Sequence, residues 1–95
     1  MKYVVRYETA PGGLDKVAEL FPRHQALWKG FLEDGTLLLI GPMADPSQGA
    51  MAVFATRAAA EAFVAVDPFV TEGLVARWEL LEWNEVLLPE VPPTA

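Results

Sequence analysis

The chain contains one histidine and no cysteine, so few of its side chains can exchange protons or attack a substrate near neutral pH. His24 lies one helical turn after Phe21 and one turn before Trp28, within an apolar stripe. An imidazole at this position needs a hydrogen-bonding partner, because an unpaired buried polar group destabilises the fold. The partner could be a backbone carbonyl in the core or at an interface, or it could be a carboxylate in an active site.

Asp67 is the carboxylate of most interest, although it also has a simple structural role. It directly precedes Pro68, and an aspartate followed by proline is typical of the start of a helix. Taken alone, Asp67 is therefore best interpreted as a helix cap.

Four further residues are candidates for binding a substrate. Arg23 and Arg6 could pair with a substrate carboxylate, because the planar guanidinium matches it in a bidentate way. Alternatively, Arg23 is a solvated helix residue and Arg6 pairs with a carboxylate across a dimer. Trp28 lies near His24 in the sequence and Phe69 lies near Asp67, so each could form a pocket wall or belong to the core.

Composition and motifs exclude several classes of function. A net charge of -6 disfavours nucleic acid and anionic membrane surfaces as partners. No apolar run is long enough to span a bilayer, and there is no P-loop, GxGxxG or HExxH motif. With one histidine and no cysteine, we expect neither a metal nor a cofactor. The absence of cysteines and of a signal-like N-terminus favours a cytoplasmic location.

The periodicity of apolar residues predicts the elements that must position these side chains. Strands are expected over residues 2–8, 36–40, 50–55 and 74–83, and the last could run on to residue 87. Helices are expected over residues 14–33 and 57–66, with Thr56 as the N-cap of the second, followed by a single turn over residues 68–72. Pro22 predicts a kink or break in the first helix, near the first turn of a second segment.

The order βαββαβ is typical of the α+β ferredoxin-like fold, a four-stranded antiparallel sheet with two helices on one face. Several predicted strands are apolar on both faces, and the helices cover only one of them. We therefore expect a homodimer formed through the other face. The domain is expected to span residues 1–88, followed by a proline-rich tail over residues 89–95.

A set of short motifs recurs in one order along the chain and resembles the YciI-like (YCII-related) family. The motifs are Arg23-His24, Gly35-x-Leu37, Gly41-Pro42 and Asp67-Pro68-Phe69, with Gly73 shortly after. The resemblance implies a ferredoxin-like subunit, a dimer and a pocket in which a histidine and an aspartate face each other, here His24 and Asp67. In such a pair the carboxylate would fix the imidazole tautomer and stabilise the imidazolium. No serine or cysteine nucleophile is evidently tied to this pair, so His24 would act as a general acid and base. Two features depart from many relatives: the loop over residues 43–49 is shorter, and the proline precedes Arg23.

These observations predict a cofactor-independent enzyme that uses His24 and Asp67 as an acid/base pair on a small organic acid or ring compound. Proton abstraction leading to isomerisation, or elimination by a lyase, fits such a pair. Two alternatives remain open at this stage. The first is a non-catalytic small-ligand-binding or accessory dimeric module, and the second is a purely structural dimer with the histidine at its interface.

Overall fold

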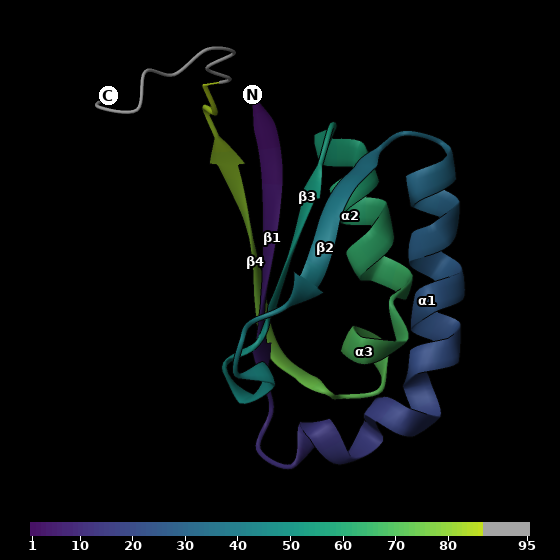
Figure 1. Cartoon of the computed structure of the whole chain (residues 1–95). Coiled ribbons are helices and arrows are strands. Elements are labelled where there is room, and N and C mark those ends of the chain that lie inside the picture. Colours follow the sequence, from purple (N-terminus) through teal and green to yellow (C-terminus); the bar gives the residue numbers. More distant parts are fainter. Residues whose placement is uncertain (87–95) are drawn as a thin grey trace.

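An antiparallel sheet with helices packed against one face makes up the part of the chain that the computed structural model describes, residues 1–86 (Figure 1). The elements follow in the order β1 (Lys2–Thr9), η1 (Gly13–Lys16), α1 (Val17–Glu33), β2 (Leu37–Pro42), η2 (Pro46–Gln48), β3 (Ala50–Phe54), α2 (Arg57–Val66), α3 (Pro68–Thr71) and β4 (Val75–Trp83). The predicted tail over residues 89–95 lies outside the described residues.

The strands lie in the order β2-β3-β1-β4, and each neighbouring pair is antiparallel. This arrangement confirms the predicted α+β fold of the ferredoxin-like type. It also places β1 in the interior of the sheet, between β3 and β4, where its side chains alternate between the two faces. Val5 and Tyr7 point towards the helices, whereas Val4 and Arg6 lie on the opposite, open face.

The main core lies between the sheet and α1 and α2. It is built around Val5, Leu37, Phe54 and Phe63, each at most 1% exposed. A second, smaller cluster around Leu20, Leu74 and Val75 joins α1 to the start of β4. The cluster fixes the N-terminal part of α1 against the sheet. His24 lies one helical turn after Leu20 in the same helix.

The first helix differs from the prediction. A 3-10 turn, η1, precedes it, and α1 then runs unbroken from Val17 to Glu33 with Pro22 inside it. Of the two predicted alternatives at Pro22, a kink or a break, the break is therefore wrong. Proline removes one backbone hydrogen bond, the one to the carbonyl of Ala18. Burial of Leu20 and His24 on either side of Pro22 holds the helix to the rest of the fold and outweighs that loss.

The strand β2 extends further than predicted, through Gly41 and Pro42. Because β2 is an edge strand, a proline can enter it without removing a hydrogen bond from the middle of the sheet. The second helix matches its prediction at both ends. The hydroxyl of Thr56 accepts a hydrogen bond from the backbone N–H of Ala59 at 3.1 Å, and Val66 is the last helical residue.

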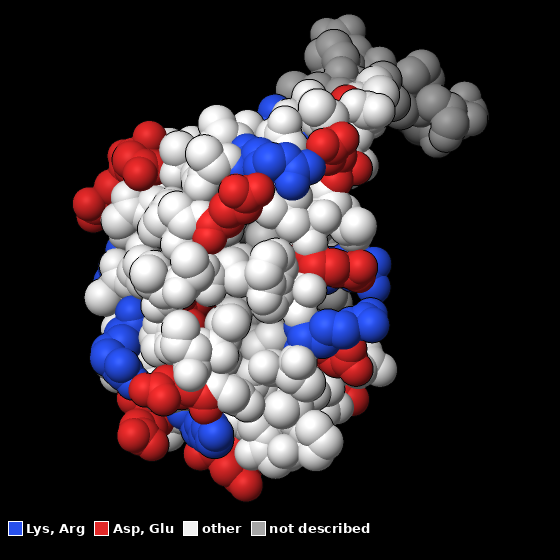
Figure 2. Space-filling model, turned by 180° about the vertical axis from the view of Figure 1, so that it is seen from behind, with Lys and Arg blue, Asp and Glu red and all other residues white. Residues whose placement is uncertain are grey.

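Charged residues lie on the surface mostly as ion pairs of opposite sign. Figure 2 shows small mixed groups of acidic and basic side chains around a broad uncharged area. One example is the contact between Arg57 and Glu82 at 2.7 Å. Within residues 1–86, no helix combines the length and the apolar character needed to cross a bilayer.

Candidate active site

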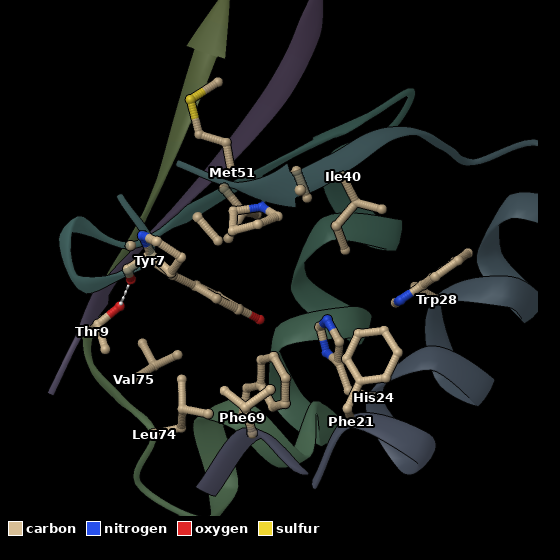
Figure 3. Close-up of a pocket in the computed structure, with 18 of the residues that line it drawn as sticks. Tyr7, Thr9, Phe21, His24, Trp28, Ile40, Met51, Phe69, Leu74 and Val75 are labelled. Atoms are coloured by element: carbon tan, nitrogen blue, oxygen red, sulfur yellow. Dashed lines mark hydrogen bonds between the residues drawn. The ribbon is translucent and has the colours of Figure 1, made fainter. Parts of the chain in front are cut away.

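A cavity of about 460 Å³ opens between the helices and one end of the sheet. Its walls come from β1, β2 and β3 on one side and from η1, α1 and α3 on the other, and most of them are apolar. Figure 3 shows three polar groups that reach the cavity: Tyr7 extends from β1 towards His24, and His24 and Trp28 come from α1 on the other side. Among residues 1–86, no carboxylate, lysine or arginine lines the cavity.

His24 lines this cavity and forms a hydrogen bond with Asp67, which is fully buried. The distance from His24 Nδ1 to Asp67 Oδ1 is 2.8 Å, and the two residues are 7% and 0% exposed. α1 presents the imidazole on its inner face, and Asp67 lies at the junction of α2 and α3. The sequence raised this pair as a hypothesis, and the structure brings the two residues into direct contact.

Asp67 receives hydrogen bonds from three donors. Besides His24, the Tyr7 hydroxyl donates to Oδ2 at 2.6 Å and the backbone N–H of Phe69 donates to Oδ1 at 3.1 Å. Donors of this kind stabilise a carboxylate that burial would otherwise destabilise. The contact with Phe69 is a helix N-cap, so Asp67 caps α3 and orients His24 with the same oxygen.

Aromatic side chains fix the orientation of the His24 ring. Phe69 stacks on it with a centroid distance of 3.8 Å and an interplanar angle of 7°, while Phe63 meets it edge-on at 6.2 Å. With Nδ1 bonded to Asp67, the remaining nitrogen, Nε2, has no hydrogen-bonding partner among residues 1–86. Since His24 lines the cavity, a ligand there can reach this nitrogen at the edge of the ring.

Tyr7 is a member of this site that the sequence analysis did not propose. Burial, reinforced by the nearby Asp67, raises the pKa of its hydroxyl well above the ordinary value. The hydroxyl therefore stays protonated and donates to Asp67. Alternation along β1 places Tyr7 on the same face as buried Val5, at the end of the strand, and this was the available signal.

The structure separates the predicted binding residues into two groups. Trp28 and Phe69 line the cavity, and the nitrogen edge of the Trp28 indole faces it (Figure 3). Arg6 and Arg23 do not line it. Arg6 pairs with Glu79 at 3.4 Å on the open face of the sheet, and Arg23 approaches Glu72 at 3.6 Å with more than half of its side chain exposed.

The site has the parts that a proton transfer requires. Asp67 fixes Nδ1–H of His24 as a donor, which leaves Nε2 as the basic nitrogen towards the cavity. The imidazolium formed by protonation would be stabilised by the carboxylate. In the described part of the chain, no group of three or more histidine, aspartate or glutamate side chains is arranged to hold a metal ion.

Residues 1–84 match the family model of the YCII-related domain. No curated protein matches the sequence. A solved 5-chloro-2-hydroxyhydroquinone dehydrochlorinase of Burkholderia phenoliruptrix AC1100, in complex with 2,5-dihydroxybenzoquinone, superimposes with a TM-score of 0.74 at 20% identity, covering 90% of this chain and 96% of that one. A Bacteroides thetaiotaomicron protein assigned to antibiotic biosynthesis monooxygenases gives 0.58 at 14% identity, covering 97% and 94%. At these identities the likeness concerns the fold.

Proposed function

This chain belongs to the YCII-related family, and we propose that it is a cofactor-independent enzyme in which His24 is the general acid and base and Asp67 orients it. The observation that supports the proposal most directly is the buried His24–Asp67 hydrogen bond at 2.8 Å, together with a cavity of about 460 Å³ that His24 lines. Trp28 and Phe69 are proposed as walls of the substrate site. Arg6 and Arg23 are left out of it, because neither lines the cavity.

The proposed reaction is an isomerisation or an elimination. His24 Nε2 takes a proton from the substrate, and the resulting imidazolium is stabilised by Asp67. The proton returns to another atom of the substrate in an isomerisation, or leaves with the departing group in an elimination. Neither reaction transfers electrons to a cofactor, so the side chains of the cavity suffice for the balance of atoms and charge.

The cavity favours a ring compound over a small organic acid. A carboxylate buried against apolar walls needs a cationic partner, and no lysine or arginine lines this cavity. A planar ring, in contrast, matches walls such as Phe69, Trp28 and Ile40. The dehydrochlorinase that shares the fold is named for a hydroxylated aromatic ring, which supports the same class of substrate.

We also propose that the protein is a homodimer formed through the open face of the sheet. Val53 pairs with both Val4 and Leu39, and Val4 pairs with Leu81, so these four residues lie together on the face away from the helices. Leu39 is 66% exposed there, although it is a large apolar residue. A second copy that covers this face would remove such side chains from water.

Turnover of small ring compounds tests the proposed activity. Hydroxylated benzenes, hydroxyquinones and lactones would be screened with the wild type, His24→Gln, Asp67→Asn and, as a control on the exposed side of α1, Lys29→Ala. We expect His24→Gln to reduce kcat by roughly 100-fold or more, because general acid–base catalysis contributes about that much. Lys29→Ala should retain the wild-type rate.

Two results would redirect this proposal. Equal activity of His24→Gln and the wild type, with both folded by circular dichroism, contradicts an acid/base role for His24. Saturable binding of ring compounds to the wild type without turnover would instead support the binding-module alternative, because the cavity would then hold a ligand that it does not convert.

A further inference from the structure

The hydrogen bonds to Asp67 decide what the cavity offers a ligand. The Tyr7 hydroxyl has one hydrogen, and it donates that hydrogen to Asp67 Oδ2 at 2.6 Å. What remains on the phenolic oxygen is acceptor capacity. Burial raises the pKa of this hydroxyl, so it stays protonated at neutral pH and keeps donating its hydrogen to Asp67. Tyr7 therefore presents an acceptor to the cavity that it lines.

The same carboxylate has the same effect on His24. In the neutral imidazole only one nitrogen carries a hydrogen, and Nδ1 uses it in the bond to Asp67 at 2.8 Å. Nε2 is then an acceptor. Asp67 thus accepts one hydrogen bond from each of these two residues. Two acceptors remain, the phenolic oxygen that extends from β1 towards His24 and the Nε2 atom of His24 on α1 (Figure 3).

The other polar groups of the wall do not change this pattern. The Thr9 hydroxyl already donates to the carbonyl of Pro46 at 2.7 Å. The Trp28 indole has a donor only, and it faces the cavity beyond His24. Of the ionisable groups, Asp67 alone contacts both Tyr7 and His24, while Arg23 and Glu72 pair with each other outside the cavity.

We propose that the cavity selects rings that carry two hydroxyl groups, one donating to His24 Nε2 and the other to Tyr7 Oη. This inference rests on the proposed substrate site, and it specifies the chemistry of the ligand. A ring with a single hydroxyl leaves one buried acceptor unpaired, and a ring with only carbonyl oxygens places acceptor against acceptor. Sites built to pair with a hydroxyl reject analogues that lack it, because their own polar groups lose a partner.

Binding of matched phenols tests this inference without any requirement for turnover. The probes are catechol, resorcinol and hydroquinone, each compared with its own monomethyl ether, in which one donor is removed and the ring is kept. Isothermal titration calorimetry gives the ratio of Kd for the ether to Kd for the parent diphenol. For at least one isomer we expect a ratio of about 5–10, the value of one neutral hydrogen bond.

Variants then identify the acceptor. Tyr7→Phe keeps the ring and removes the phenolic oxygen, so the ratio should fall to about 1. Tyr3→Phe makes the same chemical change on the same strand at a residue that does not line the cavity, and it should keep the wild-type ratio. Titration of the wild type alone already tests the preference, even if Tyr7→Phe fails to fold.

A ratio near 1 for all three isomers with the wild type overturns the inference, as does a ratio that survives in folded Tyr7→Phe. The outcome is separable from that of the proposed enzyme. If the protein binds a diphenol selectively but neither the wild type nor any variant converts it, the result supports the two-hydroxyl ligand and contradicts the proposed catalysis. If turnover depends on His24 but diphenol and ether bind equally well, the result supports the proposed enzyme and contradicts the preference for two hydroxyl groups.

Discussion

Asp67 combines a structural and a chemical role in one buried side chain. Its Oδ1 accepts from the Phe69 backbone, which begins α3, and also from His24, while Oδ2 accepts from Tyr7. Each of these bonds involves a charged acceptor, a kind worth roughly 1.5–3 kcal/mol. The local stability of α3 and the orientation of the imidazole therefore depend on the same group, and a change at Asp67 affects both.

Tyr7 should make the folded protein sensitive to alkaline pH. Burial and Asp67 raise the pKa of its hydroxyl above the ordinary value of 10.0. Below about pH 10 the hydroxyl is protonated in the folded and unfolded states alike. Above it, the unfolded chain loses a proton that the folded protein keeps, so the free energy of unfolding falls by up to roughly 1.4 kcal/mol per pH unit.

Urea denaturation between pH 9 and pH 11.5 measures this effect. In the Tyr7→Phe variant, residue 7 cannot ionise, so the free energy of unfolding should decline less steeply with pH than that of the wild type. At pH 9 the variant should be less stable than the wild type, because the hydrogen bond to Asp67 is lost. Tyr3→Phe is the control and should keep the wild-type slope. Parallel declines of wild type and Tyr7→Phe would show that ionisation of Tyr7 does not oppose folding.

Sequence alone could propose His24 and Asp67, but each was better explained separately, as a core histidine and a helix cap. Only the ordered set of family motifs linked them. The role of Tyr7 was not predicted because its partner, Asp67, is 60 residues away in the sequence. No local pattern indicates which distant segment will pack against the end of a strand. Arg6 and Arg23 were candidates only because a guanidinium can bind a carboxylate. In the structure they form ion pairs with Glu79 and Glu72, and neither arginine lines the cavity.

At the level of elements, the connection from β2 to β3 holds the end of β1 in place. Gly49, just before β3, has a φ of 119°, and a Cβ built there would lie 1.8 Å from the backbone carbonyl oxygen of Tyr7. Only glycine permits both this conformation and this approach. Because the contact is to the backbone of Tyr7, the position of its side chain in the cavity depends on Gly49.

Replacement of two glycines by alanine should therefore have opposite effects. Gly49→Ala must move either the loop or β1, and we expect a loss of roughly 2 kcal/mol or more in the free energy of unfolding, together with weaker ligand binding. Gly30 lies inside α1, and a Cβ added there would meet open space. Gly30→Ala should therefore raise the free energy of unfolding by roughly 0.5–1 kcal/mol. Urea denaturation of both variants compares them directly. A neutral Gly49→Ala would mean that the loop adapts without disturbing β1.

The predictability of the elements followed the strength of their local signals. α2 was predicted to the residue because Thr56 caps its start and the Asp67-Pro68 pair ends it. For α1, Pro22 led to the prediction of a break that does not occur. Packing of the helix on both sides of Pro22 outweighs the one backbone hydrogen bond that proline removes. The strand β2 was predicted too short, because its position at the sheet edge, where Pro42 is tolerated, is a property of the whole topology.

For the whole molecule, the proposed dimer makes a further prediction. Multi-angle light scattering should give a mass of about twice 10.4 kDa for the wild type. Leu39→Glu places a charge on the open face and should shift the protein towards monomer, because a buried unpaired carboxylate opposes association. Val66→Glu changes a similarly exposed apolar residue on α2, away from this face, and should leave the mass unchanged. A monomeric wild type at micromolar concentration would contradict the dimer.

The distance in sequence between the members of the site has a consequence for biosynthesis. Asp67 lies 60 residues after Tyr7 and 43 after His24. A ribosome adding roughly 5–20 residues per second releases β1 and α1 seconds before the segment that contains Asp67 and Phe69. Until then, neither the imidazole nor the phenol has its partner. The site is therefore among the last parts of the protein to be completed, and a nascent chain that stalls before residue 67 contains His24 and Tyr7 but no hydrogen-bonded His–Asp pair.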